Sequence, residues 1–207
     1  EYTCTRLIYL NDLHGTYSAV YIQITRGVAP RTHRFPGTDT VPTIYAGAFP
    51  MPFPENDAVK GISVTTADDI RWKRCNIKAI TLLPNTLAFN EAYEKGAQEC
   101  FYVRDGVFTE CTHSNIMAVR NNIVFTHHEG NLILSGITRK VIIQICRELN
   151  IEVREEPVKV SEMAGYSEFF ITGTGSEILP VIAIDGQTVG AGVPGNITRT
   201  LQRAFYN

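Results

Sequence analysis

The sequence predicts an α+β protein with two domains, and three observations lead to this prediction. Segments of strand and helix character are mixed along the chain without the strict alternation of a βαβ protein. Residues 50–54, with the sequence PMPFP, form a stiff extended connection, because each proline fixes φ and biases its predecessor towards extended geometry. A hydrophobic content of 44% in 207 residues is sufficient for a sizeable core. We expect residues 1–54 to hold the smaller N-terminal domain with its linker, and residues 55–207 the larger C-terminal domain.

The N-terminal part is predicted to contain a helix, two strands and a loop. Apolar residues at helical spacing predict the helix over Thr3–Leu10, and alternation predicts a strand over Tyr17–Thr25. The segment Gly27–Asp39 is rich in Pro, Gly, Arg and His, which is typical of a protruding loop. A second strand is predicted over Val41–Phe49.

The C-terminal part is predicted to be rich in short strands. Asn121-Asn122 indicates a tight hairpin between two of them. The predicted strands are Gly61–Thr66, Cys75–Leu82, Cys100–Arg104, Val107–Glu110, Ile116–Arg120, Ile123–Thr126, Glu152–Val153, Glu168–Thr172 and Ile178–Ile184. Three helices are predicted among them: Pro84–Lys95, which Gly96 closes, an amphipathic helix over Thr138–Asn150, and a C-terminal helix from about Asn196.

Composition excludes several classes of function. The formal net charge is −2 and the Lys and Arg residues are scattered, so we expect neither nucleic acid nor an anionic membrane as a partner. The sequence has no apolar run of membrane-spanning length and opens with no signal-like leader, which predicts a cytoplasmic location. The five cysteines include no C-x-x-C pair, which argues against a disulfide framework and a zinc site. We therefore expect no bound metal.

Lys78 is the first candidate for chemistry. It stands between Ile77 and Ala79-Ile80, and burial in a strand there would favour the neutral, nucleophilic amine. From spacing alone, an edge lysine whose stem packs while its head reaches water is the better interpretation of Lys78.

Two short turns and one carboxylate are further candidates. Gly136-Ile137-Thr138 opens a predicted helix, where free N–H groups, the helix dipole and a hydroxyl could bind an anion, although an ordinary threonine cap fits the same pattern. Residues 172–176, with the sequence TGTGS, form a small turn with hydroxyls that could also hold phosphate. Glu110 ends a predicted strand, and taken alone it would be a solvated carboxylate.

The order of these segments identifies a family. The segments are Ile77-Lys78-Ala79, Leu83–Ala88, Glu91-Ala92, Thr109-Glu110, Ser114-Asn115, Leu134–Arg139 and Thr172–Ile178. In this order the chain resembles the fold-type IV pyridoxal-phosphate-dependent aminotransferases, and within them the bacterial D-amino-acid type. The resemblance covers nearly the whole chain. It implies a two-domain homodimer with pyridoxal 5'-phosphate between the domains.

The resemblance also implies roles for the candidate residues. Lys78 would form the Schiff base with the cofactor and then move the proton between the substrate Cα and the cofactor. Glu110 would pair with the pyridine nitrogen and keep it protonated. Ile137, Thr138 and Thr174 would contact the phosphate, and Leu134 would pack under the ring.

The loop after residue 26 bears on the substrate. Arg31 and His33 resemble the pair that binds the substrate α-carboxylate in the D-amino-acid enzymes, and a guanidinium fork suits a carboxylate. Without the family, a solvated basic loop would be the better explanation of Arg31 and His33. The implied reaction is amino transfer between a D-amino acid and a 2-oxo acid.

Some family features have no match in this chain. The family has a further N-terminal segment that supplies an arginine to the phosphate and a tyrosine to the active site, so we expect the small domain to be incomplete. Three alternatives stay open: branched-chain L-amino-acid aminotransferase, aminodeoxychorismate lyase, and an inactive fragment.

Overall fold

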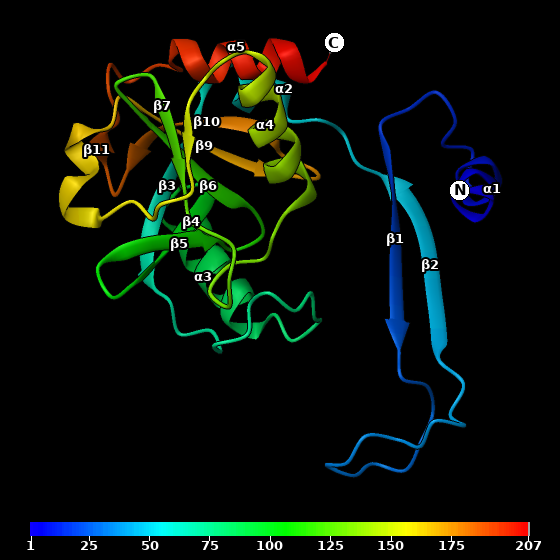
Figure 1. Cartoon of the computed structure of the whole chain (residues 1–207). Helices are drawn as coiled ribbons and strands as arrows, with labels where there is room; N and C mark the ends of the chain where they lie inside the picture. Colours follow the sequence, from blue (N-terminus) through cyan, green and yellow to red (C-terminus); the bar gives the residue numbers. More distant parts are fainter. Residues whose placement is uncertain (207) are drawn as a thin grey trace. The chain divides into compact units, whose positions relative to one another are not determined.

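The computed structural model describes residues 1–206, and the chain forms two compact units that divide between Phe53 and Pro54. Unit 1 contains the helix α1 (Tyr2–Leu10) and the strands β1 (Ser18–Thr25) and β2 (Thr43–Pro50). The two strands pair antiparallel, with Ser18 opposite Pro50 and Thr25 opposite Thr43 (Figure 1). The predicted helix, strands and intervening loop are confirmed.

Unit 2 is built on a mixed sheet. In the described part of the chain the sheet has nine strands in the order β5-β4-β3-β10-β9-β6-β7-β8, and β11 pairs with β10. The pairs β3–β4, β3–β10 and β7–β8 are parallel and the other pairs are antiparallel, which confirms the predicted α+β class. The strands are β3 (Ile62–Asp68), β4 (Glu99–Arg104), β5 (Val107–Cys111), β6 (Asn115–Arg120), β7 (Ile123–Thr126), β8 (Val153–Arg154), β9 (Glu168–Gly173), β10 (Glu177–Ile184) and β11 (Gln187–Thr188).

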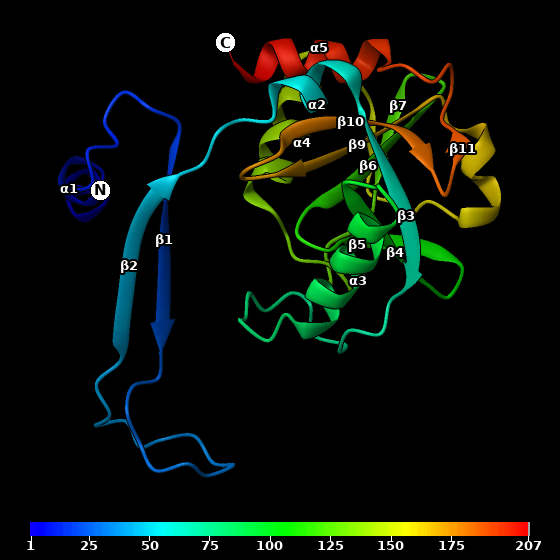
Figure 2. The ribbon, with the colours of Figure 1, turned by 180° about the vertical axis from the view of Figure 1, so that it is seen from behind.

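The helices of unit 2 lie around this sheet (Figures 1 and 2). The three predicted helices are confirmed, whereas the short helix α2, the 3-10 turn η1 and the strand β11 were not predicted. None of the helices in the described residues is long and apolar enough to cross a membrane. The helices are α2 (Glu55–Lys60), α3 (Leu83–Glu94), α4 (Ile137–Glu148), η1 (Val160–Gly165) and α5 (Asn196–Phe205).

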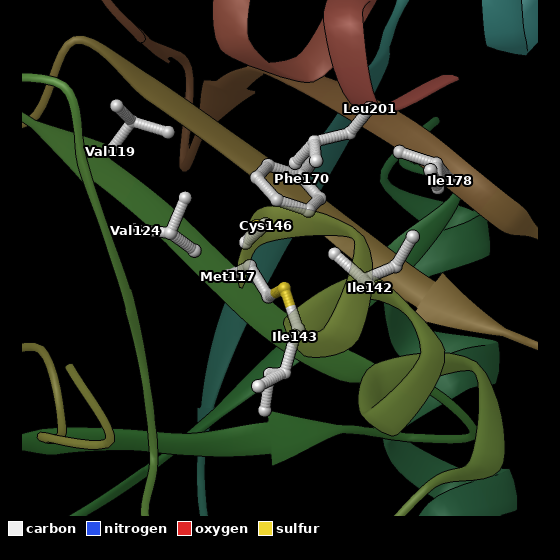
Figure 3. Packing of buried hydrophobic residues seen from close by; sticks show 9 residues of the cluster. All are labelled: Met117, Val119, Val124, Ile142, Ile143, Cys146, Phe170, Ile178 and Leu201. Atoms are coloured by element: carbon white, nitrogen blue, oxygen red, sulfur yellow. The ribbon is translucent and has the colours of Figure 1, made fainter. Parts of the chain in front are cut away.

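The main core lies between α4 and the sheet (Figure 3). Ile142 and Cys146 are one helical turn apart on α4, so both point to the same side. They meet Met117 of β6 and Phe170 of β9, which face each other across the strand pair. All four side chains are fully buried. This contact fixes α4 over β6 and β9, and therefore fixes where the helix begins.

The predicted hairpin is also confirmed. Asn121 and Asn122 have φ angles of 54° and 61°, and they join the antiparallel strands β6 and β7. Two consecutive residues with positive φ are typical of a type I′ turn, whose twist matches the flanking strands.

The predicted strand over Cys75–Leu82 is wrong. This segment is a loop between β3 and α3, in which the Ile77 N–H donates to Arg74 O at 3.1 Å. The Cys75 N–H donates to Asn131 O at 2.8 Å, in another loop. Ile77, Ile80 and Leu82 are exposed within unit 2, so their apolar spacing does not reflect burial in a sheet.

The core predicts an effect on stability. Ile142→Ala should lower the free energy of unfolding by about 2–5 kcal/mol, because it removes buried methyl groups and leaves a cavity. Urea unfolding followed by circular dichroism measures the change. Ile70→Ala is the matched control, since the Ile70 side chain is 71% exposed, and it should change the free energy of unfolding little. Equal losses in both variants would contradict this account of the core.

Candidate active site

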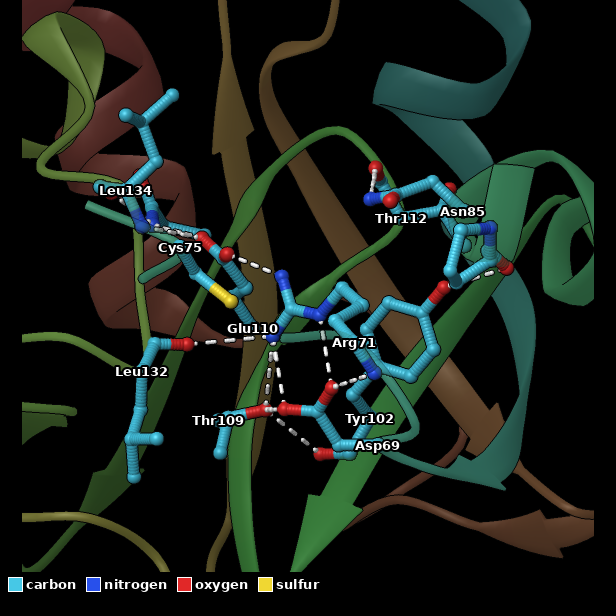
Figure 4. A network of polar contacts seen from close by, with 12 residues as sticks. Asp69, Arg71, Cys75, Asn85, Tyr102, Thr109, Glu110, Thr112, Leu132 and Leu134 are labelled. Carbon is cyan, nitrogen blue, oxygen red and sulfur yellow. Dashed lines mark hydrogen bonds and ion pairs between the residues drawn. The ribbon is translucent and has the colours of Figure 1, made fainter. Parts of the chain in front are cut away.

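Glu110 is the centre of a buried polar network at one end of the sheet (Figure 4). It lies in β5 and is only 6% exposed, so it is not the solvated carboxylate that its sequence context alone would suggest. Its Oε1 accepts a hydrogen bond from Arg71, which follows β3. Its Oε2 accepts from the Leu134 N–H at 2.9 Å and from Asn115 Nδ2 at 3.2 Å.

Burial and charge act on Glu110 in opposite directions. Burial raises the pKa of the Glu110 carboxyl to about 7, since desolvation disfavours the charged form. The Arg71 guanidinium and the Leu134 N–H oppose this rise because both stabilise the anion. The carboxyl group can therefore change its ionisation near neutral pH in response to a nearby charge.

Asn115 connects this network to the start of α4. Its Nδ2 donates to Leu134 O at 2.9 Å as well as to Glu110. A Cβ at Gly136, the residue before α4, would lie 2.2 Å from Asn115 Oδ1, so only glycine fits this close approach. The segment before the helix is thus held against β6 by a buried amide.

The β9–β10 turn lies beside the start of β6. A Cβ at Gly173 would lie 3.3 Å from the Ser114 Cβ, so the turn passes close to β6. Thr172 is directly opposite Asn115 in the β6–β9 pair, and opposite residues place their side chains on one face of a sheet. Within residues 1–206, the buried hydroxyls of Thr172 and Ser176 have no hydrogen-bond partner. Thr172, which is opposite the residue that contacts Gly136, is therefore one available donor, and Ser176 in the adjoining turn is a second.

The start of α4 can bind an anion. In the described chain no side chain caps this helix, and the N–H groups of a first turn have no partner inside a helix. The helix dipole adds positive potential at this end. Ile137 is exposed and Thr138 half-buried, so the first turn is accessible within the unit. Together with the two unpaired hydroxyls, these groups fit a phosphate.

Lys78 lies in the loop between β3 and α3. The predicted strand around it is wrong, and Lys78 is exposed in unit 2, as the alternative of a lysine whose head reaches water predicts. The loop is held at both sides of Lys78: the Cys75 N–H donates to Asn131 O at 2.8 Å, and Asn85 Nδ2 donates to Thr112 O at 2.7 Å. Asn131 lies in the segment that leads to Leu134, and Thr112 follows Glu110 by two residues. The loop therefore borders the polar network around Glu110.

The structure brings only some of the predicted residues together. Glu110 and Leu134 are in direct contact, and Ile137 and Thr138 follow at the start of α4. Thr174 is exposed in the β9–β10 turn. Arg31 and His33 belong to unit 1, where both are exposed in the loop between β1 and β2.

Sequence reasoning missed Arg71 and assigned no role to Asn115, although Ser114-Asn115 is one of the segments that carry the family resemblance. Arg71 and Glu110 are 39 residues apart, and no local pattern indicates that they pair. The one available signal was the run Asp69-Ile70-Arg71, which places two opposite charges directly after a strand.

Comparison with known proteins identifies the family. Residues 3–184 match the model of the family described as Amino-transferase class IV. D-alanine aminotransferase of Bacillus licheniformis is 43% identical over 188 residues, which are 91% of this chain and 66% of that protein. D-alanine aminotransferase of Staphylococcus haemolyticus is 40% identical over 199 residues, which are 96% of this chain and 70% of that protein. The chain thus spans 66–70% of the length of these relatives.

Solved structures agree with this match. The branched-chain amino acid aminotransferase of Escherichia coli superposes with a TM-score of 0.85 at 28% identity, over 99% of this chain and 69% of that one. The branched-chain amino acid aminotransferase of Thermobaculum terrenum, in its PLP-form, superposes with a TM-score of 0.80 at 26% identity, over 97% of this chain and 66% of that one. The chain belongs to the class IV aminotransferases. The resemblance stated from the sequence is confirmed.

The contact between Gly136 and Asn115 predicts energetic coupling. Gly136→Ala should lower the free energy of unfolding by about 1–3 kcal/mol, because the added Cβ displaces a buried amide. Asn115→Ala should also destabilise unit 2, because Leu134 O and Glu110 lose a donor. The double variant should be less destabilised than the sum by at least about 0.5 kcal/mol, since the clash is gone. Urea unfolding of the unmodified protein, the two single variants and the double variant measures these free energies. If the two single losses simply add in the double variant, Gly136 and Asn115 are not in contact.

Proposed function

We propose that this protein catalyses pyridoxal-phosphate-dependent transamination between a D-amino acid and a 2-oxo acid. The observation that carries the proposal is the match of 91–96% of the chain to D-alanine aminotransferases at 40–43% identity. The buried carboxylate and the uncapped start of α4 support it, because the reaction needs a charge near the cofactor ring and a phosphate site.

The cofactor site is proposed from groups around the start of α4. The N–H groups of Ile137 and Thr138, with the hydroxyls of Thr138 and Thr174, bind the phosphate. Leu134, which precedes the helix, packs under the ring. When bound, the cofactor supplies an aromatic ring that accepts electrons from the substrate Cα. The unpaired hydroxyls on the β9–β10 side support a polar ligand there.

Two side chains handle protons. Lys78 Nζ would hold the cofactor, and its free amine would remove a proton from the substrate Cα and return one. The Glu110 carboxylate holds a proton on the ring nitrogen. Its buried position supports this role, because a charge interaction is stronger where water is excluded.

Substrate recognition is assigned to Arg31 and His33. A guanidinium can donate two parallel hydrogen bonds to a carboxylate, and the imidazole adds a third donor. In this proposal they hold the α-carboxylate of a D-amino acid.

Branched-chain L-amino-acid transamination is the second candidate. The structural similarity to the Escherichia coli branched-chain enzyme favours it, but its 28% identity is well below the 43% of the D-alanine enzyme.

We also propose a homodimer, because β1 and β2 expose large apolar side chains that a second copy would cover: Tyr21, Ile22, Ile24, Ile44 and Tyr45. A cytoplasmic location agrees with five free cysteines.

Chemical trapping tests the assignment of Lys78. Borohydride reduction of the cofactor-loaded protein should fix a pyridoxyl group to one lysine, and peptide mass mapping should place the added mass on Lys78. Lys73→Arg is the matched control in the same loop and should leave the labelling unchanged. Label on Lys73 or Lys95 in the unmodified protein would refute the catalytic assignment.

Substrate kinetics test the assignment of Arg31. Arg31→Ala should raise the KM for D-alanine by about tenfold to a hundredfold, because a charge-assisted contact of about 1.5–3 kcal/mol is lost. An amine substrate without a carboxylate should be affected little. Arg34→Ala, in the same loop, is the control and should leave the KM unchanged. A preference for L-leucine over D-alanine in the unmodified protein would favour the branched-chain candidate instead.

A further inference from the structure

The Arg71 guanidinium donates hydrogen bonds to several groups at once (Figure 4). Its Nε and Nη2 donate to the two oxygens of Asp69, at 2.8 and 2.9 Å. Nη2 also donates to Leu132 O at 3.2 Å, and Nη1 donates to Glu110 Oε1. The residue is only 8% exposed. The guanidinium is therefore fixed in direction, and one of its nitrogens is left to face Glu110.

The aromatic ring of Tyr102 covers one face of the Arg71 guanidinium. Arg71 Cζ lies 4.5 Å from the ring centroid of Tyr102, which is fully buried in β4. The Tyr102 hydroxyl donates to Pro84 O at 3.0 Å, in the first turn of α3. A cation stacked on a fixed ring cannot turn away from its partner without losing the stacking energy.

The charges of the network are balanced in a particular way. Asp69 and Glu110 carry negative charge, and Arg71 and Arg104 carry positive charge. Arg104 Nη2 lies 3.0 Å from Asp69 Oδ1. Within the described residues, Arg71 is the only cation that pairs with Glu110. Asp69 therefore orients Arg71, and Arg71 in turn acts on Glu110.

We infer that Arg71 is a positioning residue of the transamination site, which fixes the direction of the Glu110 carboxylate and keeps it an anion beside the cofactor ring nitrogen. The inference rests on the proposed function, because it assigns a purpose to the charge on Glu110. A protonated, neutral Glu110 could not stabilise a proton on that nitrogen. Arg71 itself touches neither substrate nor cofactor in this account.

The ionisation of Glu110 depends on Arg71. Burial alone raises the pKa of Glu110, and the Arg71 charge is the largest opposing influence. Without it, the remaining groups that face the carboxyl are the Leu134 N–H, the Asn115 amide and the like charge of Asp69. The thiols of Cys75 and Cys111 nearby are neutral, since burial raises the pKa of both. Removing the guanidinium must therefore raise the pKa of Glu110 further.

Three variants test the inference in the cofactor-loaded protein. Arg71→Gln should lower kcat for D-alanine by about tenfold to a hundredfold, the size expected for a lost charge-assisted bond, with little change in KM. The acidic limb of the kcat–pH profile should move to higher pH. Arg71→Lys keeps a positive charge but lacks the planar guanidinium. It should shift the acidic limb to higher pH by less than Arg71→Gln does. Arg104→Gln removes a cation that contacts Asp69 but not Glu110, and should leave the limb in place.

A second measurement does not depend on activity. At about pH 8, near one unit above the Glu110 pKa, the infrared spectrum of Arg71→Gln without cofactor should show the C=O band of a protonated carboxyl group. That band should be much weaker in the unmodified protein, where about a tenth of the Glu110 carboxyl is protonated at this pH, and absent from the Arg71→Gln/Glu110→Gln double variant. Circular dichroism confirms that each variant is folded, and if Arg71→Gln does not fold, the same comparison is made with Arg71→Met, which also removes the charge.

The outcomes separate this inference from the proposed function. A folded Arg71 variant with no carboxyl band and an unmoved acidic limb would overturn the role of Arg71. If the unmodified protein shows no transamination, the proposed function fails, and the infrared comparison still decides whether Arg71 controls the ionisation of Glu110. A carboxyl band that persists in the double variant would assign the proton to another residue and would also overturn the inference.

Discussion

The buried carboxylate of Glu110 is the constraint on which this end of the molecule depends. A buried carboxylate without partners is strongly unfavourable, so the fold must bring donors to it from elsewhere. Arg71 comes from the loop after β3, Asn115 from β6 and the Leu134 N–H from the segment before α4. Three segments that are distant in sequence are thereby tied at one point. Each of them leads directly to a group of the proposed site.

The position of α4 depends on two different kinds of contact. Its middle is held by apolar packing of Ile142 and Cys146 against β6 and β9. Its beginning is held by the amide of Asn115, which reaches Leu134 O just before the helix. Apolar contacts alone are non-directional and would leave the helix end less precisely placed. The hydrogen bond supplies the direction, so the free N–H groups of the first turn point to a defined place.

Local signals in the sequence predicted the fold well where structure is decided locally. The Asn121-Asn122 turn and the amphipathic pattern of α4 depend on residues close in sequence, and both predictions are confirmed. The strand prediction for Cys75–Leu82 was wrong because the same apolar spacing occurs in a strand and in an exposed loop. What decides its structure is the bond from Cys75 to Asn131, which no local pattern reveals. The family order pointed to Glu110, but its partner Arg71 became visible only in three dimensions.

The register between β6 and β9 has a consequence for quality control in the cell. Met117 faces Phe170 in the core, and two residues further along the same strands Asn115 faces Thr172 at the site. Because strand side chains alternate between faces, a slip of β9 by one residue would turn both Phe170 and Thr172 to the wrong side together. A misregistered molecule would lose its core as well as its ligand groups, and would be degraded rather than persist as a stable, inactive competitor for cofactor. Correct folding and a correct site are thus selected by the same pairing.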